Sequence, residues 1–357
     1  MSDGGDREKL SYGFPTVFGR GLVAELNNFV HRPFLVVTME DLWPIFRDQL
    51  DERLCRPHFV RSVAEEDLLA ELGALPVCEA IVGLGGGQAL DTAKYFAWKL
   101  RLPIFQVPTA LSVNAVYGQR CGLRIDGQVR YVGWTVPEAV YIDYDVIRAA
   151  PRQLNYSGIG DILCFHTGVL DWRYADAQGK CEAKWPYDPH LAAQSLEKVE
   201  AVLRHRDEIR DLTDKGIEVL VDGLKWGTSY HGAGWTPRHI EGIDHFLFYA
   251  LEALTGVKFL HGQPVCLGIY AGSLLHDQRA EEMLEAVHHI GLDIRPEAMG
   301  ITWEQTTEAL CGLSDFVRKA GLWHSIAHDA EITPAFAETL RRNIEALYGA
   351  WEQGPAG

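Results

Sequence analysis

The chain of 357 residues carries a formal net charge of −16, with 47% hydrophobic and 23% charged residues. This composition is typical of a globular protein, and the length predicts about two domains. The acidic balance argues against nucleic acid or an anionic membrane as a partner, because both need clustered Lys and Arg side chains, and no apolar run is long enough to span a bilayer.

Seven cysteines lie singly along the chain, with no CxxC pair among them. An odd number of separated cysteines favours a reduced protein over a disulfide framework. The first residues, MSDGGDREKLSYGF, contain no apolar segment of the kind that a secretory signal needs. We therefore expect a cytoplasmic protein without membrane insertion.

The first 150 residues alternate strand and helix patterns. The expected strands cover residues 34–38, 59–63, 79–84, 104–107 and 140–142, the expected helices cover residues 41–54, 65–75 and 89–100, and an Asp126-Gly127 turn joins a hairpin of residues 122–125 and 129–132. Such alternation is typical of a parallel sheet with helices on both faces.

Strand patterns almost vanish after Pro151, and long helical patterns take their place. Examples are residues 191–212, 242–254, 281–290 and 335–348. We therefore predict an α/β domain over residues 1–150 and a mostly α-helical domain over residues 151–357. Glycine and proline in residues 230–239 predict an irregular loop, either a pocket wall or a plain surface loop.

The sharpest local signal is a glycine-rich junction between an expected strand and an expected helix. Gly85, Gly86 and Gly87 let the backbone approach a ligand closely, because no Cβ atom stands in the way. The helix that follows offers free N–H groups, which suit a pyrophosphate. The spacing matches neither G-x-G-x-x-G nor a Walker loop, so a plain tight turn with Asp91 near the helix start is the alternative.

Thr109 and Ser112 follow the next expected strand, at the edge where parallel sheets bind ligands. Their hydroxyl groups could hydrogen-bond a ribose or a nicotinamide amide. Helix capping is the simpler explanation when these residues are considered alone.

Asp161, His245 and His261 are candidate metal ligands. One carboxylate and two imidazoles, with a coordination position left open, suit a catalytic zinc or ferrous iron. Spacing alone does not establish such a site, because the three lie far apart and the chain has 14 histidines. His324 and His328 would share a helix face, but no HExxH glutamate lies between them, and packing explains them better.

Together, these motifs resemble those of a known superfamily. They are Gly-Gly-Gly at 85–87 with Asp91 and Lys94, Pro-Thr-x-x-Ser at 108–112, Gly-x-x-Asp at 158–161, His245, and Leu-His-Gly at 260–262, in that order. The chain resembles the superfamily of iron-containing alcohol dehydrogenases, glycerol dehydrogenases and dehydroquinate synthase-type cyclases. The nearest branch is that of the glycerol-1-phosphate dehydrogenases.

The resemblance implies a Rossmann-like nucleotide-binding domain, a helical domain, and an active site in the cleft between them. It assigns one divalent metal, zinc or iron, to Asp161, His245 and His261, and NAD(H) or NADP(H) to Gly85, Gly86, Gly87, Asp91, Lys94, Thr109 and Ser112. The metal would serve as a Lewis acid while hydride passes between the cofactor and a CH–OH carbon. We expect an oxidoreductase acting on a small polyol, polyol phosphate or ketone.

Three positions depart from the family pattern. Asn114 stands where the dehydrogenases usually carry Asp near the substrate, Tyr249 where they carry a second His, and Gln263 where they carry Glu. Tyr249 would share a helix face with His245 and could relay a proton, although a phenol with a pKa of about 10 is a poorer base than His. Asn114 and Tyr249 are therefore the expected catalytic residues.

The departures leave two alternatives open, namely a sugar-phosphate cyclase and a catalytically silent nucleotide-binding protein. The cyclase branch carries Glu at the position of Asp161 and Lys at that of Cys164, which counts against it. Arg152, Arg238 and Lys258 could bind a substrate phosphate, but a solvated charge explains each of them better. The choice between NAD and NADP and a homo-oligomeric state are left open.

Overall fold

The computed structural model describes residues 15–125, 128–229 and 235–351, and these form two compact units. One unit holds the chain up to Asn155 and takes up a short segment that begins at Thr228. The other holds Tyr156–Gly227 and the residues from Trp235 on. The division thus lies slightly after residue 150, and the chain returns once to the first unit.

Six parallel strands form the sheet of the first unit, in the order β1-β8-β5-β4-β2-β3. They are β1 (Thr16–Gly19), β2 (Phe34–Thr38), β3 (Cys55–Phe59), β4 (Ala80–Gly85), β5 (Ile104–Pro108) and β8 (Ala139–Asp143). β6 (Cys121–Ile125) and β7 (Gln128–Val132) pair as the expected antiparallel hairpin, whose Asp126-Gly127 turn lies outside the described residues. The predicted α/β class is confirmed.

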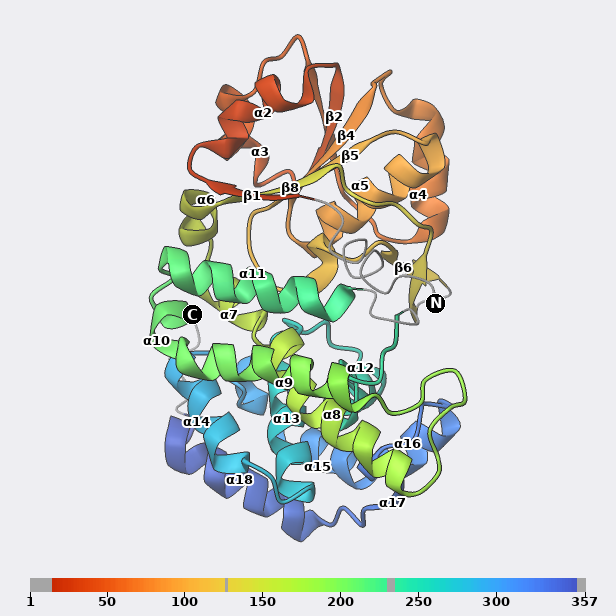
Figure 1. The fold of residues 1–357 in the computed structure, drawn as a ribbon, viewed down its shortest axis with the longest axis vertical. Coiled ribbons are helices and arrows are strands. Elements are labelled where there is room, and N and C mark those ends of the chain that lie inside the picture. The colour runs from red at the N-terminus through yellow and green to blue at the C-terminus, as the bar shows by residue number, and fades with distance from the viewer. Residues whose placement is uncertain (1–14, 126–127, 230–234, 352–357) are drawn as a thin grey trace. The chain divides into compact units, whose positions relative to one another are not determined.

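Helices cover both faces of the sheet because successive strand residues point to opposite sides (Figure 1). α2 (Leu22–Val30) and α3 (Trp43–Phe46) pack on the face that carries Phe34, Val36 and Val82. α4 (Glu65–Glu71) and α5 (Gly87–Leu100) pack on the face that carries Leu35, Val37 and Ile81. α6 (Tyr144–Ala149) and the 3₁₀ turns η1 (Arg47–Gln49), η2 (Leu72–Ala74) and η3 (Asn114–Val116) complete this unit.

Two elements of the first unit differ from the expectation. The strand expected at residues 59–63 is β3, and Pro57 and polar side chains conceal this edge strand in the sequence pattern. The helix expected at residues 41–54 stops after η1, because Leu50 adopts an extended backbone.

β1 and α2 were not predicted, and a distant contact explains the start of α2. The Asp143 carboxylate accepts a hydrogen bond from the Leu22 N–H at 2.7 Å, although the two residues are 121 positions apart.

The described residues of the second unit contain helices and no strand. After α7 (Arg152–Ser157) come α8 (Gly160–Ala177), α9 (Pro189–Arg204), α10 (Arg206–Arg210), α11 (Asp214–Thr228), α12 (Ile243–Thr255), α13 (Gly262–Leu275), α14 (Ala280–Ile290), η4 (Pro296–Met299), α15 (Trp303–Cys311), α16 (Leu313–Lys319), α17 (Ile326–Asp329) and α18 (Pro334–Tyr348). The prediction of a mostly α-helical second part of the chain is thus confirmed. Among the described helices, none has both the length and the apolar character to cross a membrane.

Candidate functional site

Close packing of two helix starts brings Asp161 and His261 together. Asp161 lies in the first turn of α8, and His261 directly precedes α13. A Cβ atom on Gly160 would lie 2.8 Å from the Gly262 Cα, and one on Gly262 would collide with the Ser157 carbonyl. These glycines allow the two backbones to approach closely enough for their neighbouring side chains to meet.

A second pair of glycines brings α12, which carries His245, against α13. A Cβ atom on Gly268 would lie 2.5 Å from the Asp244 carbonyl oxygen, and Gly272 packs against the Ile243 side chain. Gly268 and Gly272 are four residues apart and therefore share one face of α13. The sequence analysis missed this spacing of small residues, which signals a close helix contact.

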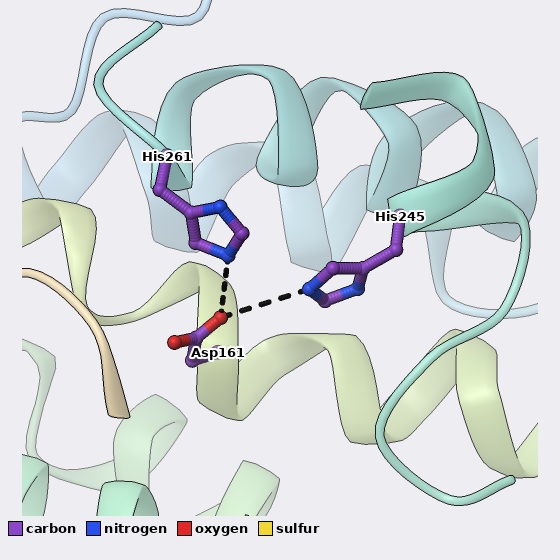
Figure 2. Close-up of side chains that lie close together, drawn as sticks. All are labelled: Asp161, His245 and His261. Carbon is purple, nitrogen blue, oxygen red and sulfur yellow. Dashed lines mark hydrogen bonds and ion pairs between the residues drawn. The ribbon is translucent and has the colours of Figure 1, made fainter. Parts of the chain in front are cut away.

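Figure 2 shows the three candidate metal ligands, which converge on one point. The Asp161 Oδ1 atom lies 2.8 Å from His261 Nε2 and 3.7 Å from His245 Nε2. All three residues offer ligand atoms within 4.8 Å of one another. Asp161 and His245 are buried, and His261 is partly exposed.

The surroundings of Asp161 and His245 favour the charged form of each side chain. Burial alone would raise the pKa of Asp161, but the imidazoles of His261 and His245 hold it well below its usual range. Burial lowers the pKa of His245, but the nearby carboxylates of Asp161 and Asp244 outweigh this effect and raise it to about 10. A buried carboxylate that faces two ring nitrogens fits a divalent metal such as zinc or iron.

The glycine-rich loop of the first unit leaves space at the start of α5. Gly85 has a φ of +157°, and its carbonyl accepts a hydrogen bond from the Thr109 N–H at 3.0 Å. A Cβ atom on Gly86 would meet no atom of the described residues within 4 Å, whereas one on Gly87 would lie 3.2 Å from Val113. Open space before the N–H groups of a 14-residue helix fits a pyrophosphate. Ser112 lies two residues before η3, and Asn114 is the first residue of η3.

Lys94 has a different task from the cofactor contact that we expected. Its ammonium group is buried and lies 2.6 Å from the Asp91 carboxylate. It donates hydrogen bonds to the carbonyls of Ala115, Gly118 and Arg120, at 2.7–3.0 Å. Asp91 and Lys94 therefore form an internal clamp that holds residues 115–120 against α5. The ammonium has no donor to spare for a phosphate, so the assignment of Lys94 to cofactor binding is wrong.

Replacing Lys94 by Met is expected to lower the free energy of unfolding by about 3–5 kcal/mol, because Asp91 would lose its cationic partner and three backbone carbonyls would lose their donor. Urea unfolding measures this loss. Lys99→Met is the matched control in the same helix, since the Lys99 ammonium is partly exposed and its pair with Glu65, at 3.8 Å, is worth at most about 1 kcal/mol. An equal loss in both variants would contradict the clamp.

Comparisons with known proteins agree with this geometry. A sequence model described as iron-containing alcohol dehydrogenase matches residues 20–151. The glycerol-1-phosphate dehydrogenase (NAD(P)+) of Hyperthermus butylicus is 29% identical over 231 residues, which cover 64% of this chain and 65% of the relative. The protein of the same name from Sulfolobus acidocaldarius is 25% identical over 345 residues, which cover 92% of this chain and 95% of the relative. Residues 20–151 thus match the iron-containing alcohol dehydrogenase family.

A solved structure extends the fold likeness to almost the whole chain. Glycerol dehydrogenase from Schizosaccharomyces pombe superposes with a TM-score of 0.70 at 19% identity, covering 95% of this chain and 93% of that one. At this identity the likeness shows the fold alone. The chain spans 65% of the length of each of the first two curated relatives that it matches.

The three departures from the family pattern have different surroundings. Gln263 is buried and donates a hydrogen bond to the Asp293 carbonyl at 2.7 Å, which the Glu usual in the family could not do when ionised. Tyr249 lies on α12 with its ring centroid 6.2 Å from that of His245. The Asn114 carbonyl accepts a hydrogen bond from the Tyr117 N–H, which closes η3.

Arg238 is neither a solvated charge nor free for a phosphate. It is only 1% exposed, and its guanidinium donates to the His324 carbonyl at 2.8 Å and lies 3.6 Å from Glu182. Arg152 and Lys258 are exposed. His328 accepts a hydrogen bond from the Ser325 N–H and so caps α17, which agrees with a packing role.

Proposed function

We propose that this chain is a divalent-metal-dependent, NAD(P)-linked dehydrogenase that acts on a small polyol or polyol phosphate. The convergence of Asp161, His245 and His261 carries the proposal, because this donor set suits a metal with an open coordination position. The bound metal would supply Lewis-acid polarisation of the substrate oxygen. The names of the curated relatives support glycerol-1-phosphate as the first substrate to test.

The residues of the chain have separate tasks in this proposal. Gly85, Gly86 and Gly87 receive the cofactor pyrophosphate at the start of α5, which holds the nicotinamide in place for hydride transfer. The hydroxyl groups of Thr109 and Ser112 hydrogen-bond the ribose or the carboxamide. Asn114 contacts the substrate through a neutral amide, so it adds no negative charge near a phosphorylated substrate.

Tyr249 moves the proton of the substrate hydroxyl, since it stands on α12 one turn beyond His245. Tyr249→Phe is expected to lower kcat by about 100-fold or more, because it removes the only ionisable group of this side chain. Tyr249→His is expected to retain turnover with a pH profile displaced to lower pH, since His titrates below Tyr. Steady-state kinetics over a range of pH test both variants, and an unchanged kcat in Tyr249→Phe would remove Tyr249 from the proton path.

A reductase assay tests the function. The metal-free protein is loaded with zinc or with ferrous iron and mixed with NADH or NADPH and either dihydroxyacetone or dihydroxyacetone phosphate. Stoichiometric oxidation of the reduced cofactor supports the proposal, and the ratio of the two kcat/KM values tells whether the substrate carries phosphate. Phosphate release from a sugar phosphate without net cofactor oxidation would indicate a cyclase. Cofactor binding without any turnover would indicate a silent homologue.

A further inference from the structure

We propose that Asp244 is a positioning residue that fixes the orientation and the tautomer of His245. The inference rests on the proposed metal site and extends it beyond the three ligands. Asp244 is fully buried in the first turn of α12, directly before His245 in the chain.

The Asp244 carboxylate is held in place by donors from two helices. Its Oδ2 accepts a hydrogen bond from the Thr167 hydroxyl of α8 at 2.6 Å. Its Oδ1 accepts the backbone N–H of His245 at 2.8 Å and that of Gly242 at 3.4 Å. The carboxylate therefore has a fixed position before any contact with the imidazole is considered.

The imidazole of His245 meets this fixed acceptor. His245 Nδ1 lies 2.5 Å from Asp244 Oδ1, whereas its Nε2 faces Asp161. A carboxylate that accepts from Nδ1 keeps the proton on that nitrogen, which leaves the Nε2 lone pair for a metal. Asp244 thus decides which ring nitrogen points into the cluster and in which direction.

Cys164, Asp244 and His245 also lie close enough to form a second ligand group. Both oxygens of Asp244 are already engaged by N–H and O–H donors. Burial raises the pKa of the Cys164 thiol well above its usual value, which disfavours the thiolate that a metal needs. These contacts favour an orienting role for Asp244 over a second metal site.

Two substitutions separate the hydrogen bond from the charge. In Asp244→Asn, the backbone N–H groups of Gly242 and His245 keep the amide oxygen at the Oδ1 position, so the contact with Nδ1 persists without its charge. Asp244→Ala removes the acceptor. We expect zinc affinity to fall about 10-fold in the first variant and about 100-fold in the second.

Asp171→Asn is the matched control. Asp171 is also a buried aspartate that supports the start of α12, where its Oδ2 accepts the Ile243 N–H at 2.7 Å. Its other oxygen accepts from the Ile326 N–H and from His276, so it contacts no proposed ligand. This variant is expected to lower the melting temperature and to leave zinc affinity within about threefold of wild type, well below the loss expected for Asp244.

Competition between the metal-free protein and a zinc chelator measures the dissociation constants. A ¹⁵N-histidine spectrum of the zinc-loaded protein gives a second readout, with His245→Gln to assign the signal. We expect a slowly exchanging Nδ1–H signal from His245 in wild type and in Asp244→Asn.

Zinc affinity in Asp244→Asn that equals that of Asp171→Asn would overturn the inference, even if Asp244→Ala does not fold. Equal zinc affinity in wild type and in His261→Ala would overturn the metal site itself, and the role of Asp244 with it. If His261→Ala binds zinc more weakly while both Asp244 variants keep wild-type zinc affinity, the metal site stands and only the role of Asp244 is overturned.

Discussion

Replacing Asp161 with Ala is expected to remove the bound metal and to lower kcat/KM by about 1000-fold or more. The carboxylate is the one negative ligand of the proposed set, and it lies within 4 Å of both imidazoles. Without it, two neutral or cationic rings face each other, which is a poor environment for a divalent cation. Loss of the several kcal/mol that a Lewis acid contributes corresponds to this factor. His261→Ala is expected to have the same effect.

Elemental analysis of the purified variants measures the metal directly, and the reductase assay measures the turnover. His276→Ala is the matched control, because His276 pairs with the buried Asp171 at 2.9 Å in the same unit. It loses a comparable buried contact away from the cluster, and we expect it to keep its metal. Metal content at the wild-type level in both Asp161→Ala and His261→Ala would refute the site.

Gly86→Val is expected to weaken dinucleotide binding by about 100-fold or more, which corresponds to about 2.7 kcal/mol. Gly86 has an extended backbone with a φ of −81°, which a branched residue adopts without strain. Since a Cβ atom there would meet no atom of the described residues, the variant is expected to fold normally. The isopropyl group would instead occupy the space proposed for the pyrophosphate.

Calorimetry with NADH and with NADPH measures the affinity. Gly73→Val is the matched control, because a Cβ atom on Gly73 also meets no described atom within 4 Å and Gly73 lies in η2 of the same unit. It is expected to bind the dinucleotide as wild type does. An unchanged affinity for the dinucleotide in Gly86→Val would mean that the loop is a tight turn that does not bind the pyrophosphate.

The strands and helices were predicted most accurately where neighbouring residues form a clear apolar pattern. The buried strands β2, β4 and β5 were predicted nearly to the residue, because parallel strands covered on both faces form short, continuous apolar runs. β3 was displaced because an edge strand is only half buried and has no such run. α2 was missed because the group that holds its first turn, Asp143, lies in another part of the chain.

The sequence by itself determined the alternation of strands and helices and the glycine loop, because neighbouring residues form these patterns. It also indicated the three candidate ligands, because their motifs occur in a recognisable order. Only the tertiary structure decided that Asp161, His245 and His261 meet, since the packing of α8, α12 and α13 at glycine positions sets those distances. It also decided that Lys94 serves the fold, because a buried ammonium is directed by whichever oxygens the folded chain places around it.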